Sequence, residues 1–330
     1  MKIINFILLF YLLLFNQAYS NSNFDKWLIS FTEIAYTQGI SKKTIDNVLI
    51  KAKFLPDVIR YDRYQPEFYE DTKTYVQKRV SKKKVKNGID LFKKNSKIIN
   101  QIEKEFNVEK ELLLALMGIE TNYGNYLGKM DIISSLATLS FDQRRSEFFS
   151  KELITVLKLI DLELVEPDTL YGSWAGAFGN FQFMPSTINK YAIDYDKNNS
   201  IDLKSINDSF ASAANYVSKI GWNRGEPCFK KIKLKDNTPL KFLNTSARDI
   251  KFKKKLKYYK KYIVNYDNLK INENMRSAIV TPDKDIIKNA ETLSPAFIVF
   301  NNYELVLKWN RSLRFAIAVC TLKDNFKNEF

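Results

Sequence analysis

The sequence contains no histidine, and this absence narrows the chemistry that the chain can perform. Histidine-based triads, histidine-ligated zinc and histidine general bases are all excluded. Acid–base chemistry near neutral pH must therefore come from carboxylates, lysine, tyrosine or cysteine. The only two cysteines are Cys228 and Cys320. In an oxidising compartment they could form a disulfide, but two buried thiols are an equal alternative, and the sequence leaves both open.

Long apolar runs are almost absent, and the one exception lies at the N-terminus. Lys2 precedes the apolar run 3–15, and the small residues Ala18 and Ser20 precede a predicted cleavage site. This pattern predicts a signal peptide over residues 1–20, with an uncleaved anchor as the alternative. No cysteine lies near that site, which argues against a lipid anchor, and no later stretch predicts a membrane span. We therefore expect an exported protein without a stable membrane span after cleavage.

Acidic residues are outnumbered by basic ones. The chain has 52 lysines and arginines against 37 aspartates and glutamates, a formal net charge of +15. Such an excess suggests a nucleic-acid partner, but export and the lack of the aromatic and glycine spacing of an RNA-binding sheet argue against nucleic acid. A solvated basic surface that favours approach to a carboxylate-rich polymer is the remaining interpretation.

Apolar spacing of three and four residues predicts a mainly α fold, and 330 residues suffice for a sizeable core. The predicted helices include 89–106, 108–120, 148–163 and 210–220. We expect an N-terminal helical region over 21–106, a catalytic core over 107–224, and a C-terminal helix over 301–330 that returns to the core. Between them, residues 225–300 alternate short apolar runs with lysine-rich stretches, which predicts a small β-containing insert.

One predicted helix carries an acid where a core residue is expected. Helix 108–120 has Asn107 as its predicted N-cap, and its inward stripe is formed by Leu112, Leu113, Leu116 and Met117. The next position on that stripe is Glu120. Partial desolvation and the negative end of the helix dipole both disfavour the charged form, so we expect the pKa of Glu120 to be raised. A protonated acid there suits protonation of a glycosidic oxygen, whereas a glutamate that turns to solvent is the alternative.

Several motifs follow one another in an order that is more specific than any one of them. They are Asp62–Phe68, Ile119–Gly124, Leu136–Phe141, Arg144–Phe149, Gly172–Ser186, Ala214–Tyr216, Gly221–Trp222 and Asn310–Ser312. Together they resemble the lytic murein transglycosylase B family, a lysozyme-like group of periplasmic enzymes. The resemblance covers nearly the whole mature chain and is weakest over about 229–290. It implies a periplasmic location and a lysozyme-like helical core.

The resemblance implies a reaction on peptidoglycan glycan strands. Glu120 would protonate the β-1,4 bond between N-acetylmuramic acid (MurNAc) and N-acetylglucosamine (GlcNAc), then deprotonate the muramyl 6-hydroxyl, which attacks the anomeric carbon and leaves a 1,6-anhydro end. No water is consumed and no cofactor is needed for catalysis. One carboxylate suffices, whereas ordinary glycoside hydrolysis uses two. Asp131 and Asp142 are candidates for a second carboxylate by sequence distance, and we interpret both as structural.

The resemblance also implies a set of substrate-binding residues. Ser173 and Gln182 match polar groups that contact the sugar or orient the acid. The other positions are Tyr75, Tyr123, Arg144, Arg145, Tyr216, Trp309, Asn310 and Phe315. Aromatic faces and hydrogen-bonding groups suit sugars, although the two arginines could instead pair with Glu147. Trp309 and Phe315 stand where the family commonly has tyrosine, so the rings could still stack on a sugar but could not offer it a hydroxyl group.

The segment 194–208 resembles a calcium loop that some family members contain. Its predicted ligands are Asp194, Asp196, Asn198, the Ser200 carbonyl and Asp208. Asn199 stands where an EF-hand has glycine, and asparagine tolerates the left-handed turn needed there. Lys197 and the serine at loop position 12 depart from the pattern. A structural Ca²⁺ and a plain polar turn are the two alternatives.

The sequence thus predicts a monomeric enzyme whose partner is peptidoglycan. A cell-wall binding protein without turnover and a hydrolytic muramidase of the same fold are the alternatives. Endo or exo cleavage, protein partners and the role of the lysine-rich insert are left open.

Overall fold

The computed structural model describes residues 22–65 and 69–329. The predicted signal peptide, 1–20, lies outside the described residues. The chain divides into two compact units, which are described in turn: Met1–Arg63 with Leu127–Leu203, and Tyr64–Tyr126 with Lys204–Phe330. Within the described residues, no helix is long and apolar enough to cross a membrane.

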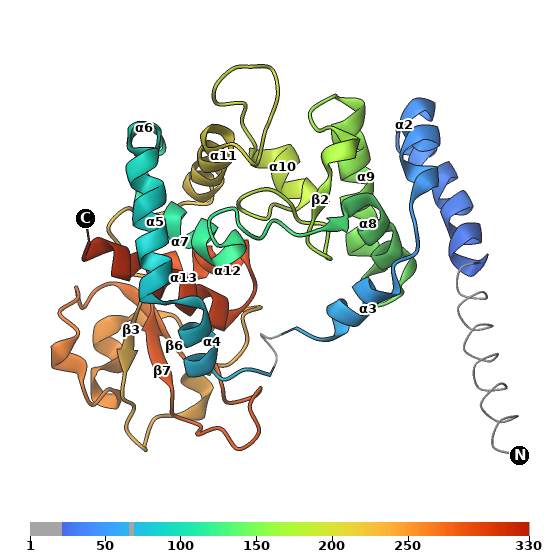
Figure 1. Cartoon of the computed structure of the whole chain (residues 1–330). Coiled ribbons are helices and arrows are strands. Elements are labelled where there is room, and N and C mark those ends of the chain that lie inside the picture. The colour runs from blue at the N-terminus through green and yellow to red at the C-terminus, as the bar shows by residue number, and fades with distance from the viewer. Residues whose placement is uncertain (1–21, 66–68, 330) are drawn as a thin grey trace, which may run out of the picture. The chain divides into compact units, whose positions relative to one another are not determined.

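The first unit is built around two packed helices, α8 and α9 (Figure 1). Serine and aspartate caps start its helices: Ser41 caps α2, and the Asp131 carboxylate accepts from the Ser134 N–H at the start of α8. Helix α3 packs on α8, and α10 packs on α9. The elements of this unit are the helical residues 22–37, α2 (Lys42–Asn47), η1 (Leu49–Lys51), α3 (Pro56–Arg63), β1 (Met130–Asp131), α8 (Ile132–Phe141), α9 (Ser146–Asp161), η3 (Pro167–Thr169), β2 (Tyr171–Gly172) and α10 (Pro185–Tyr191).

The second unit is built around helix α7 (Lys110–Thr121), which is buried on all sides from Glu111 to Gly118. Helices from both ends of the unit's sequence pack against it, so the predicted inward stripe is too narrow: residues 111–118 are buried on every side of the helix. The packed helices are α5 (Lys82–Lys94), α6 (Ser96–Phe106), α11 (Ile206–Lys219) and α13 (Leu313–Lys327), and the unit also contains α4 (Thr72–Arg79) and α12 (Asn301–Trp309).

Two helix boundaries differ from the sequence prediction. Asn107 has a left-handed backbone, with φ of 54°, and ends α6, whereas the N-cap of α7 is Glu109. The prediction of Asn107 as an N-cap is therefore wrong, because asparagine suits the left-handed end of a helix as well as a cap. The predicted helix 89–106 is likewise two helices, since Asn95 ends α5 and begins α6.

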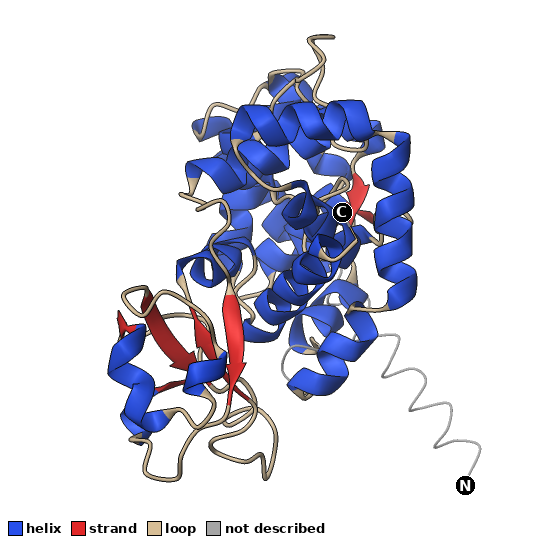
Figure 2. Ribbon diagram, turned by 90° about the vertical axis from the view of Figure 1, so that its left-hand side faces the viewer, coloured by secondary structure: helices blue, strands red, loops and turns tan. Residues whose placement is uncertain are grey.

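The β-containing insert is confirmed: it holds a five-stranded sheet with the order β3-β7-β6-β4, in which β5 also pairs with β6. The strands of the insert form the red group at the lower left of Figure 2. Strands β3, β7 and β6 are antiparallel neighbours, β5 is antiparallel to β6, and β4 is parallel to it. An apolar cluster that includes Phe242, Leu256 and Tyr259 packs with the sheet residues Ile279 and Ile298. The elements are β3 (Phe229–Ile232), η4 (Leu240–Phe242), β4 (Leu243–Asn244), β5 (Lys254–Lys255), η5 (Leu256–Tyr262), η6 (Tyr266–Asn268), β6 (Arg276–Val280) and β7 (Ala296–Val299).

The C-terminal segment returns to the helical core, as predicted, but as two helices. Helix α12 ends at Trp309, and Ser312 caps α13, so the predicted single helix over 301–330 is wrong. Helix α13 packs on α7. Cys228 and Cys320 form a disulfide with their Cα atoms 6.1 Å apart, which settles the alternative that the sequence left open and joins the insert to α13. The predicted domain boundaries stay predictions.

Candidate functional site

Glu120 lies in the last turn of α7, where the buried helix emerges from the core. The helix ends at Asn122, which has a left-handed backbone and donates its N–H to the Met117 carbonyl. Glu120 is half-buried, whereas the residues that precede it from Glu111 to Gly118 are buried. The predicted alternative of a glutamate turned fully to solvent is thereby wrong: the side chain has a partner in the protein.

That partner is the indole of Trp309, whose Nε1–H donates to Glu120 Oε1 over 2.9 Å. The Trp309 ring stacks on Tyr216, with centroids 5.1 Å apart and planes 24° from parallel. The Tyr216 hydroxyl donates to the Lys308 carbonyl at the end of α12. Three predicted site residues from α7, α11 and α12 therefore form one group. Stacking on Tyr216 holds the Trp309 indole in the position from which it donates a hydrogen bond to Glu120.

The indole N–H has an effect on Glu120 that local sequence does not indicate. A donor aimed at a carboxylate favours the charged form, whereas partial burial and the helix C-terminus disfavour it. The Trp309 hydrogen bond therefore opposes the two effects from which the sequence predicts a protonated Glu120, and it also orients the carboxyl group. The raised pKa of Glu120 stays a prediction.

Tyr123, in contrast, is used for packing. Its hydroxyl donates to the Lys84 carbonyl over 2.8 Å, and burial raises the pKa of the phenol. A Cβ on Gly88 or Gly118 would lie within 3 Å of that hydroxyl, so only glycine at both positions leaves room for the ring. The Lys84 ammonium donates to the Gly118 carbonyl over 2.7 Å, and burial lowers its pKa. These contacts join α5 to the last turns of α7 beside Glu120.

The other predicted residues of the second unit differ in accessibility. Tyr75 is buried in α4 under the guanidinium of Arg79, 3.5 Å from the ring centroid. Phe315 is buried in the first turn of α13, and Asn310 is half-buried just after α12. Asn310 therefore has the most exposed side chain of the three residues. The contacts of all three with substrate stay predictions.

In the first unit, Arg144 and Arg145 are held by one buried aspartate. Asp62 of α3 is 2% exposed. Its carboxylate accepts hydrogen bonds from Arg144 Nε, over 2.7 Å, and from Arg145, and its backbone carbonyl accepts a second hydrogen bond from Arg144. Glu147, the partner considered from sequence, pairs with Lys151 instead. The pairing with Asp62 was missed because it spans 82 positions, although Asp62 begins one of the family motifs.

The two candidates for a second carboxylate have structural partners, as predicted. Asp142 receives two hydrogen bonds from Arg63, at 2.8 and 3.0 Å, which lower the pKa of Asp142. Asp131 is the N-cap of α8 and accepts from the Ser134 N–H. Both carboxylates are thus engaged in the folded chain.

Ser173 and Gln182 belong to one compact loop. The Ser173 hydroxyl accepts from the Ala177 N–H, and its N–H donates to the Ala177 carbonyl. Gln182 has a left-handed backbone, with φ of 50°, which is uncommon for glutamine and costs conformational energy. Its side-chain amide donates to the Leu127 and Gly179 carbonyls. Strain at a half-buried polar residue is typical of a functional position.

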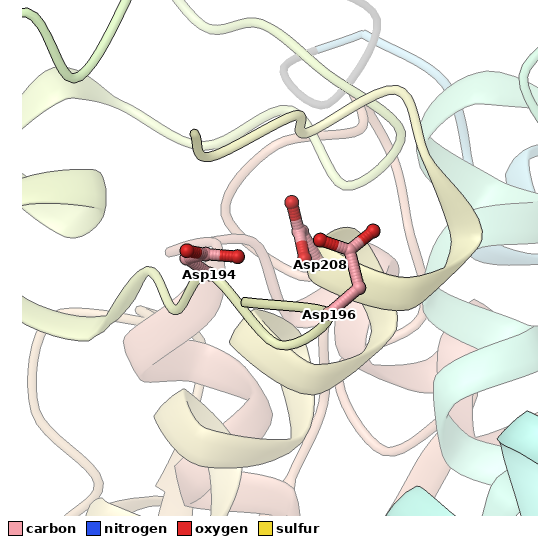
Figure 3. A group of neighbouring side chains, drawn as sticks. All are labelled: Asp194, Asp196 and Asp208. Atoms are coloured by element: carbon pink, nitrogen blue, oxygen red, sulfur yellow. The ribbon is translucent and has the colours of Figure 1, made fainter. Parts of the chain in front are cut away.

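The segment 194–208 brings three carboxylates together (Figure 3). Asp194, Asp196 and Asp208 each offer an oxygen, and these atoms lie within 4.8 Å of one another. The Asn198 and Asn199 N–H groups donate to Asp194, and Asn199 has φ of 68°, the left-handed turn expected at that loop position. An all-oxygen set of this kind matches the ligands that Ca²⁺ prefers.

The chain is similar to a known family along almost its whole length. The family model described as "Transglycosylase SLT domain" matches residues 23–324. The membrane-bound lytic murein transglycosylase B of Escherichia coli (strain K12) is 33% identical over 198 residues, which are 57% of this chain and 55% of that protein. The chain therefore spans about half the length of this curated relative in the match.

Solved structures confirm the lysozyme-like helical fold. SltB3 from Pseudomonas aeruginosa, in complex with NAG-NAM-pentapeptide, has a TM-score of 0.80 at 29% identity and covers 92% of this chain and 79% of its own. The Escherichia coli lytic transglycosylase Slt35, in complex with calcium, has a TM-score of 0.74 at 24% identity, covering 94% of each chain. The latter supports the fold alone.

Proposed function

We propose that this chain, which belongs to the transglycosylase SLT domain family, is an exported enzyme that cleaves the glycan strands of peptidoglycan. The substrate would be the β-1,4 bond between MurNAc and GlcNAc. The observation that carries the proposal is Glu120, a half-buried acid held by the Trp309 indole at the end of a buried helix. SltB3, a structural relative at 29% identity, has been solved in complex with NAG-NAM-pentapeptide and with NAG-anhNAM-pentapeptide, which supports the same substrate class.

The mechanism needs one carboxyl group that first donates and then accepts a proton. Protonated Glu120 transfers its proton to the glycosidic oxygen as the bond to the anomeric carbon breaks. The carboxylate then removes the proton of the muramyl 6-hydroxyl, whose oxygen bonds to the anomeric carbon. Glu120 ends protonated, no water is consumed, and the product carries a 1,6-anhydro ring. The structural partners of Asp131 and Asp142 support a mechanism with one carboxylate.

Mass analysis of the products tests the reaction class. Digestion of purified sacculi should release soluble muropeptides whose sugar end is lighter by one water than a reducing end. Reducing ends would instead identify a muramidase, and no release would identify a binding protein without turnover.

The Trp309 indole should matter through its N–H as well as through its ring. We expect Trp309→Phe to keep the stack on Tyr216, remove the hydrogen bond to Glu120 and lower kcat by about tenfold, the usual size for a hydrogen bond to a charged group. Steady-state rates on soluble glycan fragments measure this. Trp27→Phe, in the aromatic cluster of the first unit, is the matched control and should keep full activity. Equal rates in both variants would contradict a role for the indole N–H.

We also propose that the segment 194–208 binds a structural Ca²⁺ through Asp194, Asp196 and Asp208, with the Asn198 side chain and the Ser200 carbonyl as further ligands. The proposal depends on the oxygen donors that the loop gathers. Asp208 lies in the first turn of α11.

Calcium should raise the thermal stability of the chain. We expect Tm to increase by about 2–4 °C at millimolar Ca²⁺ relative to chelator, because binding to the folded state alone stabilises it. Asp194→Asn should remove the increase, and Asp168→Asn, at an exposed aspartate of η3 outside the loop, should keep it. Equal Tm values with Ca²⁺ and with chelator would leave a plain polar turn.

Location and assembly are proposed on the same grounds. The predicted signal peptide and the substrate class support a periplasmic location. The monomeric state stays a prediction, which gel filtration with light scattering would test. The contacts of Ser173, Gln182, Arg144, Arg145, Tyr216 and Asn310 with sugar are likewise proposed from the family resemblance.

A further inference from the structure

Most of the net positive charge of the chain comes from one part of the insert, residues 229–276. Residues 229–276 contain 13 lysines and two arginines against four acidic residues, a net charge of +11, while the whole chain carries +15. All of these lysines except Lys253 are exposed. Lys253 pairs with Glu304, and Lys260 lies 3.7 Å from Asp267. The insert therefore presents a strong positive potential in a small volume.

Aromatic side chains lie among these lysines, around the buried ring of Phe242. The ring centroids of Phe252, Tyr258 and Tyr262 lie 5.8, 5.9 and 5.4 Å from that of Phe242. Phe252 and Tyr258 are each 41% exposed. Two exposed rings and the half-buried ring of Tyr262 thus share one buried neighbour, which places them together on the insert.

Three lysines stand over these same rings. Lys254 Nζ lies 5.9 Å from the Tyr258 centroid, Lys261 Nζ lies 4.9 Å from that of Tyr262, and Lys241 Nζ lies 5.6 Å from that of Phe242. We call the six residues Lys241, Phe252, Lys254, Tyr258, Lys261 and Tyr262 the lysine–aromatic patch. Leu240, next to Lys241, is 60% exposed and adds an aliphatic side chain.

Phe252 combines a partly exposed ring with an uncommon backbone conformation. Its backbone is left-handed, with φ of 52°, a conformation that is costly for a bulky residue and that asparagine or glycine adopts more easily. The Tyr259 hydroxyl donates to the Phe252 carbonyl and holds that conformation. A strained backbone and a partly exposed apolar ring thus occur at the same residue.

We propose that the lysine–aromatic patch docks the protein onto an anionic phospholipid bilayer. Lysine ammonium groups are attracted to the negative surface of such a bilayer, and aromatic rings settle at its interface. The 13 lysines against two arginines favour a diffuse charge over bidentate recognition of single groups. The exposed leucine and phenylalanine gain from a lipid interface, whereas a hydrated carboxylate polymer offers them little. This docking is independent of the proposed catalytic activity.

Vesicle sedimentation tests the proposal with the predicted mature chain, residues 21–330, since the apolar run 3–15 would itself bind lipid. We expect binding to vesicles of phosphatidylglycerol and phosphatidylcholine, weak binding to phosphatidylcholine alone, and loss of binding at about 0.5 M salt through screening. No preference for the anionic vesicles would overturn the proposal.

Charge variants locate the docking surface. The combined change Lys241→Gln, Lys254→Gln and Lys261→Gln should weaken vesicle binding at least about tenfold. A matched triple at exposed lysines elsewhere, Lys43→Gln, Lys51→Gln and Lys97→Gln, removes the same charge and should cost less than about threefold. Equal reductions in the two triples would overturn the proposal, because net charge alone would then explain binding.

The ring and the competing partner are tested separately. Phe252→Asn suits the left-handed backbone, so the fold should persist while vesicle binding falls. Unchanged binding by this variant would count against an interfacial role of the patch. The wall polymer is tested by retention of the protein on purified sacculi at 4 °C. If the triple variant of Lys241, Lys254 and Lys261 loses this retention but still binds vesicles, the surface binds the wall polymer and the proposal is overturned. Cleavage of soluble glycan fragments should be the same in both triples, which separates docking from catalysis.

Discussion

Glu120→Gln is expected to reduce release of muropeptides from purified sacculi by about 10²- to 10⁴-fold, the usual contribution of a general acid–base group. Glutamine matches glutamate in size and can still accept from the Trp309 indole, so the orientation of the side chain is kept. It has no acidic proton to give to the leaving oxygen and cannot remove the proton of the muramyl 6-hydroxyl. Both half-steps therefore fail together.

The rate on sacculi is measured by release of soluble material and by mass analysis of its ends. Glu147→Gln is the matched control, because this exposed glutamate pairs only with Lys151 on the surface of α9, and we expect full activity. An unchanged melting temperature in Glu120→Gln would show that the loss is chemical. Turnover by Glu120→Gln at the wild-type rate would contradict the assignment of Glu120.

Local features of the site were predictable from the sequence. The helix that carries Glu120 follows from apolar spacing and lies where expected, although it ends at Thr121 with Asn122 as its C-cap. Trp309 was selected from the family motifs, and its indole contacts Glu120. The presence of strands in the insert was also predictable, because short apolar runs between lysine stretches are typical of strands. The alternation of faces was not, since β6 and β7 are buried along almost their whole length.

Features that depend on distant pairing were not predictable. The hydrogen bond from Trp309 to Glu120 spans 189 positions, and the pairing of Asp62 with Arg144 spans 82. Nothing in local periodicity indicates which charges or donors meet after folding. Asn107 was misplaced for a different reason, since one residue type serves both helix starts and left-handed helix ends.

Glu109→Gln is expected to lower the free energy of unfolding by about 3–5 kcal/mol, because it leaves a buried positive charge without its counter-ion. Glu109 is the buried N-cap residue of α7 and lies 3.6 Å from the ammonium of Lys323 on α13, which is also buried. Its carboxylate accepts from the Gly225 N–H over 2.8 Å and from the Trp222 indole. Chemical denaturation at pH 7 measures the loss, and Glu147→Gln, at an exposed pair, should leave stability nearly unchanged.

The pH dependence of this difference follows from the sign of each shift. Burial alone would raise the pKa of Glu109, but the Gly225 N–H, the Lys323 charge and the Trp222 indole together lower it. A lowered folded-state pKa gives stability that is present above the unfolded value and is lost as pH falls through the folded one. The difference between wild type and Glu109→Gln should therefore begin to shrink as pH falls below the unfolded value of about 4.5, where the unfolded chain takes up the proton first, and it should be smallest below the lowered folded-state pKa, where the folded wild-type carboxyl is protonated too. A constant difference from pH 7 to pH 3 would contradict the ionised pair.

A second substitution separates the unpaired charge from the missing hydrogen bonds. Burial lowers the pKa of Lys323 because the charged ammonium is poorly solvated beside the Trp222 ring, 5.8 Å from its centroid. Lys323→Met removes that charge with similar volume, so the double variant with Glu109→Gln should be more stable than Glu109→Gln alone. Equal stability of the single and double variants would place the cost in the contacts to Gly225 and Trp222. Helix α7 carries Glu120 at its other end. A chain without the Glu109–Lys323 pair should therefore lose activity at a lower temperature than the wild type, because α7 loosens at a lower temperature.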